Sequence, residues 1–326
     1  MNKIWTLLNN KKERLIYPQM GGMGLELTEY KLFEVYQDPE KQLEIALKIE
    51  ENFPTDFTYP VDFGTVFLDT WKVPLLKPDY DFPSTAENPI INIEDLHILK
   101  TINPYTDGLM PQYIDSISKI ANTINKPEMV ATVGPFTLAA ELAGLHNLAK
   151  STIKNREFVE ALLDIAMENI ENFVRASIKA GAQCIQVSEP TAVILSPKMF
   201  KKYVTPRLKK IINIINESSI SAIHICGDTN IYIPEILDTK PQIISVDQVM
   251  SMKELIKKVP TDVVLAGNID PVDIMLNASQ KEVYNTTKKL LNDMEPYANF
   301  MISFGCDCPN KTPIENINAV VEAIHK

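Results

Sequence analysis

The chain has 326 residues, of which 45% are hydrophobic and 23% charged, a balance typical of a folded globular protein. Its 32 basic and 42 acidic residues give a formal charge of −10, which argues against a broad nucleic-acid surface, because phosphate binding needs clustered Lys and Arg. The sequence shows no apolar run of the ~20 residues that a membrane helix needs, no signal-peptide core, and too few Cys for a disulfide framework. We therefore expect a cytoplasmic, reduced protein that binds neither nucleic acid nor membrane.

Short apolar runs recur along the chain and alternate with longer, more polar stretches. They are rich in Val and Ile and bounded by Gly, Pro or Asp, which is the pattern of buried strands. The runs cover residues 15–20, 56–62, 129–134, 184–189, 222–226, 243–248, 263–268 and 300–306. Helical patterns lie between most of them, with the clearest over residues 39–53, 155–182 and 196–219.

This alternation predicts parallel strands, and eight such units predict a closed (β/α)8 TIM barrel in which residues 1–326 form one domain. The residues before the first run form an N-terminal extension. The stretch 63–128 is too long for one loop, so we expect an inserted excursion after strand 2, with a hairpin and extra helices over the barrel mouth. An open doubly wound sheet is the alternative.

The candidate site residues stand where the predicted strands end, because the active site of a (β/α)8 barrel lies at the carboxyl ends of its strands. Polar side chains and soft metal ligands gather there to an extent that core packing does not explain. They are Asp62, Glu189, His224, Cys226, Asp247, Asn268, Asp270 and Cys306, with Cys308 just beyond.

The sharpest motif is His224-Ile225-Cys226, which lies on a predicted strand. Side chains alternate along a strand, so the His and the Cys point to the same face. Together they form half of a zinc site, and a third ligand would leave one position open, as in catalytic zinc centres. Cys306, at the end of the eighth run, can supply that ligand, although Cys308 remains an alternative.

Other residues have a structural explanation of equal or greater weight. Cys184 starts a predicted strand and is interpreted as a small buried hydrophobe. Asn268 and Asp270 either orient a bound cofactor or substrate or form an Asx cap at the next helix. The segment 134–144 could present backbone N–H groups to an anion, but a tight strand-to-helix turn is the simpler interpretation.

These motifs resemble the uroporphyrinogen decarboxylase superfamily, and within it the zinc-dependent corrinoid methyltransferases, which include the methylcobamide:coenzyme M methyltransferases. The resemblance covers nearly the whole chain and is strongest over residues 181–326. It implies that zinc is held by His224, Cys226 and Cys306. A decarboxylase would lack the His-x-Cys pair and would carry a His where Cys306 stands.

The decarboxylase signature itself is broken in this chain. Its Arg-containing MRQAGR segment is matched by residues 20–25, which place Gly21 and Leu25 at the two Arg positions, and its PWTLASY Tyr is matched by Glu141. Asp62 keeps the decarboxylase pattern. A porphyrinogen with many carboxylates needs such cations, so this resemblance implies the scaffold of a decarboxylase without its chemistry.

The resemblance implies a zinc-activated thiolate, of coenzyme M or a similar thiol, that takes a methyl group from a corrinoid. A partner protein must present the corrinoid, because the chain has no Asp-x-His-x-x-Gly pattern. Glu189 is predicted to be a fourth ligand or a proton acceptor, and Asp62 and Asp247 to orient ligands or substrate. The alternatives are transfer from a methyl donor onto the corrinoid in a demethylating system, a decarboxylase, and a non-catalytic binding protein.

Overall fold

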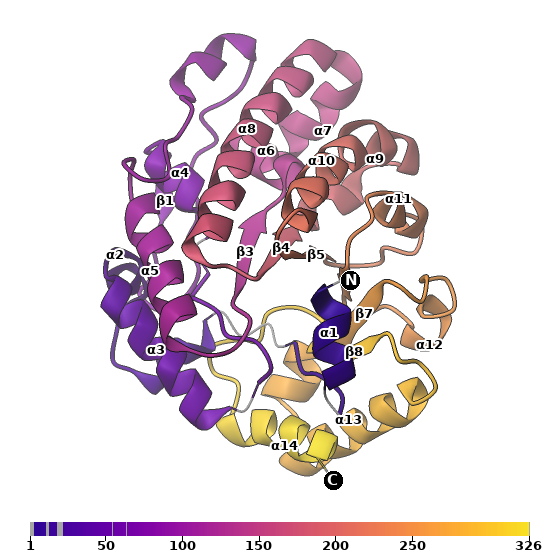
Figure 1. Cartoon of the computed structure of the whole chain (residues 1–326). Helices are drawn as coiled ribbons and strands as arrows, with labels where there is room; N and C mark the ends of the chain where they lie inside the picture. Colours follow the sequence, from indigo (N-terminus) through magenta and orange to yellow (C-terminus); the bar gives the residue numbers. More distant parts are fainter. Residues whose placement is uncertain (1–2, 11–12, 18–21, 54, 63, 326) are drawn as a thin grey trace.

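The computed structural model describes residues 3–10, 13–17, 22–53, 55–62 and 64–325. Its central feature is a parallel six-stranded sheet in the order β3-β4-β5-β6-β7-β8, with helices packed around it (Figure 1). Each of these strands overlaps one of the predicted apolar runs, so six of the eight strand predictions are confirmed. The strands are β3 (Met129–Val133), β4 (Cys184–Ser188), β5 (Ile220–Ile225), β6 (Ile243–Val246), β7 (Val264–Ile269) and β8 (Phe300–Phe304).

The first two predicted runs extend this sheet by one parallel bridge at each edge instead of forming full strands. Ile16 bridges to Ile302 of β8, and Thr58 bridges to Glu128, the residue before β3. Residues 18–20 of the first run lie outside the described residues.

The local sequence explains why these two runs do not pair as longer strands. The backbone N–H of Ile16 donates to a carboxylate oxygen of Asp56 over 2.8 Å, and Pro60 has no N–H to add to a ladder. The two segments nevertheless lie against each other: the rings of Tyr17 and Phe57 pack edge to face, with their centroids 5.0 Å apart.

The helices that follow the strands are largely those predicted. α3 (Pro39–Asn52) and α8 (Arg156–Ala180) match the sequence patterns, but the single pattern over 196–219 forms two helices that meet at Val204. The second of these has Pro206 in its first turn, where the missing N–H is tolerated. In one continuous helix, Pro206 could not donate to the carbonyl four residues earlier, which favours a break at this point. The remaining helices are α1 (Lys3–Asn10), α2 (Leu32–Gln37), α6 (Pro135–Ala143), α7 (Leu145–Lys154), α9 (Pro197–Tyr203), α10 (Thr205–Asn216), α11 (Ile233–Asp238), α12 (Met252–Leu255), α13 (Gln280–Met294) and α14 (Ile314–His325), with the short helical turns η1 (Met23–Leu27), η3 (Pro190–Ile194) and η4 (Pro271–Leu276).

The long stretch between the second run and β3 contains the kinds of element that its length predicted. A two-stranded antiparallel hairpin pairs β1 with β2, and helices precede and follow it. In chain order the elements are α4 (Val66–Thr70), β1 (Leu75–Leu76), β2 (Ser84–Thr85), η2 (Ile93–Ile98) and α5 (Met110–Thr123).

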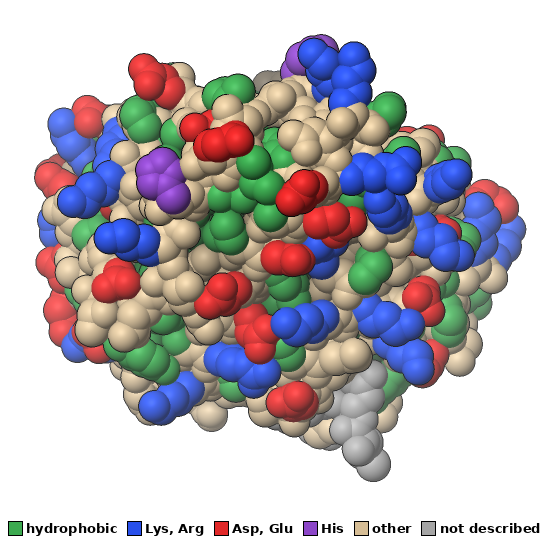
Figure 2. Space-filling model, turned by 90° about the horizontal axis from the view of Figure 1, so that it is seen from above, with side chains coloured by type: hydrophobic (Ala, Val, Ile, Leu, Met, Phe, Trp, Pro, Cys, Tyr) green, Lys and Arg blue, Asp and Glu red, His purple; other side chains and the backbone are tan. Residues whose placement is uncertain are grey.

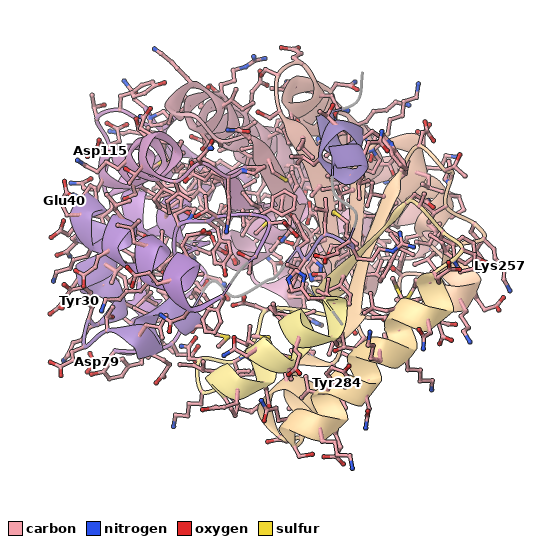
Figure 3. All side chains as sticks on the ribbon, turned by 60° about the horizontal axis from the view of Figure 1, so that its bottom comes forward. Tyr30, Glu40, Asp79, Asp115, Lys257 and Tyr284 are labelled. Carbon is pink, nitrogen blue, oxygen red and sulfur yellow. The ribbon has the colours of Figure 1, made fainter. Side chains whose placement is uncertain are left out.

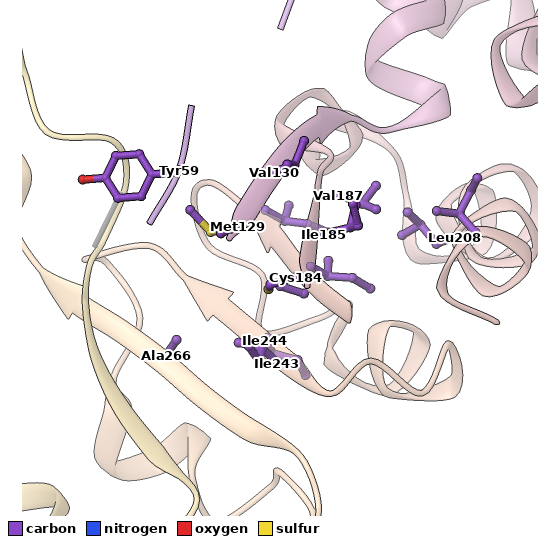
Figure 4. Close-up of a cluster of buried hydrophobic side chains, with 14 of the residues drawn as sticks. Tyr59, Met129, Val130, Cys184, Ile185, Val187, Leu208, Ile243, Ile244 and Ala266 are labelled. Carbon is purple, nitrogen blue, oxygen red and sulfur yellow. The ribbon is translucent and has the colours of Figure 1, made fainter. Parts of the chain in front are cut away.

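One large hydrophobic cluster extends from Ile4 in α1 to Val321 in α14. Side chains of β3, β4 and β6, together with Leu208 of α10, take part in it (Figure 4). Acidic and basic side chains are interspersed on the face seen in Figure 2. Among the described residues there is no helix both long and apolar enough to cross a membrane.

Candidate metal centre

The candidate site is built at the carboxyl ends of β5 and β8. His224 is the second-last residue of β5, and Cys226 directly follows that strand. Because side chains alternate along a strand, both point to the inner face. Cys306 comes two residues after β8, and the backbone N–H of the intervening Gly305 bonds to the carbonyl of Ile269 over 2.7 Å. The carboxyl ends of β5 and β8 therefore bring His224, Cys226 and Cys306 together.

The three predicted metal ligands converge in the structure. The Nε2 atom of His224 lies 3.2 Å from Sγ of Cys226, and the Sγ atoms of Cys226 and Cys306 are 3.6 Å apart. One ligand atom from each residue lies within 4.8 Å of the others, and the described residues offer no second cluster of this kind. The structure thus groups Cys306, rather than Cys308, with the His-x-Cys pair.

The two thiols differ in acidity because they share a hydrogen bond. The bond from Cys226, followed by one from His224, lowers the pKa of Cys306 well below that of an ordinary thiol. The same bond, together with burial, raises the pKa of Cys226. Cys306 is therefore the thiolate of the pair, and a thiolate is the form of Cys that binds metals.

Contacts from β6 and the loop after it hold the ligands in position. A 3.0 Å hydrogen bond joins Nδ1 of His224 to the hydroxyl of Ser245, which leaves Nε2 directed at the thiols. Asp247 accepts the backbone N–H of Gly227 over 2.7 Å and that of Val249 over 3.0 Å. Asp247 therefore fixes the turn that carries Cys226, and its predicted part in catalysis stays a prediction.

A cavity of about 240 Å³ opens beside the three ligands. It is mostly apolar, and residues from β3, β4, β5 and the excursion line it. The lining residues are Tyr59, Pro60, Asp62, Phe82, Met129, Ala131, Gln186, Ser188, Pro190, His224, Cys226, Cys306 and Asp307. Among the four acids predicted at the site, which are Asp62, Glu189, Asp247 and Asp270, Asp62 is the one that lines this cavity.

Glu189 makes contacts that the sequence did not predict. Its carboxylate is fully buried and accepts the backbone N–H groups of Phe136 and Thr137, each over 2.9 Å, and the Thr137 hydroxyl over 2.8 Å. The Glu189 carboxylate thus caps the N-terminus of α6. We expected that packing would not explain a carboxylate at this strand end, and these hydrogen bonds correct that expectation. Gly134 makes the space, since a Cβ there would lie 2.2 Å from the Glu189 side chain. A role for Glu189 as fourth ligand or proton acceptor stays a prediction.

Burial raises the pKa of Glu189 to about 7, although the hydrogen bonds from α6 act in the opposite direction. Burial likewise raises the pKa of Glu141, on the same helix, to about 8, with the charges of Asp62 and Glu189 adding to the effect. A cluster of buried carboxyl groups therefore lies beside the site.

Asn268 and Asp270 have structural partners and are absent from the residues that line the cavity. The amide of Asn268 donates to the carbonyls of Asp247 and Met250, and Asp270 caps η4 by accepting the backbone N–H groups of the second and third residues of that turn. The Asx-cap interpretation is therefore confirmed for Asp270. The predicted binding of a cofactor or substrate by Asn268 and Asp270 stays a prediction.

The other two Cys residues lie outside the ligand group. Cys184 is fully buried in the apolar cluster of Figure 4, and burial raises its pKa to about 12, as expected for a core residue. Cys308 is also buried, and burial raises its pKa above the ordinary range.

Sequence inspection of strand ends missed several residues that line the cavity. Gln186 and Ser188 point inward from β4, two residues apart, and strict alternation within the run 184–189 could have identified them. Tyr59, Phe82 and Asp307 come from irregular segments, where no periodic signal exists.

One His and two Cys at the carboxyl ends of parallel strands, beside a small cavity, define an α/β enzyme with a candidate metal centre. The model of the uroporphyrinogen decarboxylase (URO-D) family matches residues 20–326, and the chain belongs to this family.

Named relatives include both methyltransferases and decarboxylases. The methylcobamide:CoM methyltransferase MtbA of Methanosarcina acetivorans is 29% identical over 248 residues, which are 74% of this chain and 70% of that protein. The uroporphyrinogen decarboxylase of Carboxydothermus hydrogenoformans is 25% identical and covers 91% of this chain and 86% of its own. A solved methyltransferase from Methanosarcina mazei shares the fold with a TM-score of 0.89 at 22% identity, over 99% of this chain and 97% of its own. The predicted family and the predicted class of enzyme, a methyltransferase, are confirmed.

Proposed function

We propose that this protein moves a methyl group between a corrinoid, carried by a partner protein, and a small thiol, with zinc held by His224, Cys226 and Cys306. Coenzyme M is the thiol named for the MtbA relatives. The observation that carries the proposal is the convergence of these three ligand atoms within 4.8 Å beside a cavity of about 240 Å³.

The donor set fits zinc in both chemistry and spacing. Zinc binds thiolate sulfur at about 2.3 Å and imidazole nitrogen at about 2.0 Å, so tetrahedral ligands would place two sulfurs about 3.8 Å apart and a sulfur and nitrogen about 3.5 Å apart. The corresponding separations here are 3.6 Å and 3.2 Å. Three protein ligands leave one position for the sulfur of a substrate.

Bound zinc would supply the positive charge that keeps a substrate thiol ionised at neutral pH. The protein supplies the positioning: Ser245 orients the imidazole, and Asp247 fixes the turn after β5. Asp62 brings a carboxylate to the cavity wall, where it can accept the proton that the thiol loses.

The size of the cavity supports delivery of the corrinoid by a partner. About 240 Å³ is less than the ~300–1,000 Å³ of sites that enclose drug-sized ligands, and a corrinoid is larger than those. A cavity of this size would therefore not enclose the corrinoid, and the partner protein would have to present it at the mouth.

We also propose that the sheet closes into a (β/α)8 barrel, with residues 1–326 as one domain. The bridges of Ile16 and Thr58 add a seventh and an eighth member at the two edges of the sheet. The hydrogen bond from Ile16 to Asp56 and the contact between Tyr17 and Phe57 join these members to each other. A cytoplasmic location stays a prediction.

Decarboxylation of a porphyrinogen is not supported by the residues at the matching positions. Leu25 is 3% exposed and packs in the hydrophobic core, and Glu141 adds a carboxyl group where the substrate brings its own. Gly21 lies outside the described residues.

The test is methyl transfer from methylcobalamin to a panel of thiols, followed by cobalamin absorbance. We expect thiol-dependent loss of methylcobalamin that disappears in Cys226→Ala. Loss of methylcobalamin at the same rate in the wild type and in Cys226→Ala would refute the proposal.

A further inference from the structure

The segments that follow β4, β5, β6 and β7 each expose one large apolar side chain. We call these segments the mouth loops; they are residues 189–196, 226–232, 247–251 and 270–279. Because the four strands are parallel, all four loops lie at the carboxyl end of the sheet, where the candidate metal centre also lies. The exposed side chains are Ile194, Ile231, Val249 and Val272, each between 46% and 61% exposed. None of them is among the described residues that line the cavity, so each is available to a molecule outside it.

The opposite end of the same sheet differs. Among the described residues, no large apolar side chain is exposed in the segments that precede β4 to β8, which are residues 181–183, 217–219, 239–242, 256–263 and 295–299. α1 lies against this end, where the indole N–H of Trp5 donates to the carbonyl of Asp262 over 3.3 Å. Single exposed apolar residues are common on any protein, but their presence on four consecutive loops at one end of a sheet is typical of an interaction surface.

The mouth loops also carry charge of one sign. They contain five acidic residues and no Lys or Arg; the acids are Glu189, Asp228, Asp247, Asp270 and Asp273. Asp228 and Asp273 are exposed, and each stands within three residues of an exposed apolar side chain. A partner that complements this face therefore has apolar side chains at its centre and basic side chains around them. A second copy of this chain does not meet that requirement, because two such faces would bring carboxylates together without cations.

We infer that the mouth loops are the docking surface for the protein that carries the corrinoid, with apolar contacts to Ile231 and Val249 at its centre. This rests on the proposed methyl transfer. Since a cavity of about 240 Å³ would not enclose a corrinoid, its carrier has to lie against the mouth during transfer. The mouth loops are the surface that it meets there, because one of them begins with the candidate ligand Cys226.

Two methyl donors separate docking from the chemistry of transfer. One is free methylcobalamin, and the other is a methylated corrinoid protein with the Asp-x-His-x-x-Gly pattern from the organism that produces this chain. The double variant Ile231→Gln/Val249→Gln replaces two exposed apolar side chains by polar, uncharged ones. We expect its kcat/KM with the corrinoid protein to fall at least tenfold, and its kcat/KM with free methylcobalamin to change less than threefold.

Leu47→Gln is the matched control, because it makes the same kind of replacement far from the mouth. Leu47 is exposed on α3, a helix of the outer wall, where Glu40 of its first turn is labelled in Figure 3. This variant should change neither kcat/KM by more than twofold. The acids of the mouth loops add a dependence on salt: kcat/KM should fall between about 50 and 500 mM salt with the corrinoid protein, and stay constant with free methylcobalamin.

The possible results distinguish this inference from the proposed function. An unchanged kcat/KM with the corrinoid protein in the double variant, or an equal loss with both donors, would overturn the inference while leaving thiol methylation in place. A wild-type dimer that becomes a monomer in the double variant, measured by light scattering, would assign the face to a second copy and would also overturn it. Methyl transfer from neither donor would refute the proposed function, and the inference with it.

Discussion

Glu189 links the stability of the protein to pH through its burial beneath α6. Burial raises its pKa from 4.5 to about 7, so the folded protein holds the Glu189 proton more tightly than the unfolded chain does. The stabilising contribution is fully present below pH 4.5 and is lost as the pH rises through about 7. The rise in pKa corresponds to about 3 kcal/mol, lost at about 1.4 kcal/mol per pH unit.

Glu189→Gln removes this titration and keeps the shape of the side chain. We expect the free energy of unfolding of the variant, relative to wild type, to increase between pH 4.5 and 7 by about 3 kcal/mol. Loss of the Glu189 charge also relieves Glu141, whose pKa it helps to raise, and this acts in the same direction.

The assay is urea unfolding of the wild type and Glu189→Gln at half-unit steps from pH 4.5 to 8. Glu217→Gln, which removes an exposed carboxylate at the end of α10, serves as the control and should show no such trend. A difference between wild type and Glu189→Gln that stays constant over this range would refute the assignment of a buried, titrating carboxyl group. The methyl-transfer rate of the same variant tests the predicted catalytic role, for which we expect a 10- to 1,000-fold decrease.

The remaining predictions concern the ligands and one further buried acid. Cys226→Ala and Cys306→Ala should each lose zinc, whereas Cys184→Ala, which removes an equally small thiol from the core, should keep about one zinc per chain by elemental analysis. Ser245→Ala should weaken zinc affinity about 10- to 100-fold in chelator competition, because it frees the imidazole of its orienting hydrogen bond. Glu128 is fully buried, both its carboxyl oxygens lack a hydrogen-bond partner among the described residues, and burial raises its pKa. Glu128→Met should therefore stabilise the protein by about 1–3 kcal/mol at pH 7, measured by urea unfolding. A loss of stability in this variant would contradict the prediction.

The convergence of the candidate metal ligands could be predicted from the sequence because their signal is largely local and periodic. His224 and Cys226 stand two residues apart on a strand, so geometry alone places them together. Cys306 needed the further expectation of parallel strands whose carboxyl ends meet, and the six-stranded sheet provides this.

Other contacts could not be predicted, because they depend on segments that are remote in sequence. The sequence places Glu189 at a strand end but does not reveal that the N-terminus of α6, more than fifty residues earlier, lies against it. The sequence predicts that Asp247 orients ligands or substrate and leaves Asn268 open between that role and a turn, but it does not reveal that loop N–H and carbonyl groups are their partners. The first two predicted strands were wrong in extent, since Pro60 and the bond to Asp56 interrupt regular pairing.

The most direct test of the central claim is X-ray absorption at the zinc edge, recorded on purified protein with and without a methyl-accepting thiol. His224, Cys226 and Cys306 predict two sulfur ligands and at least one nitrogen ligand around zinc in the free protein. Addition of the thiol should raise the number of sulfur ligands to three. An unchanged sulfur count under conditions in which the thiol is methylated would contradict activation of the thiol at this centre.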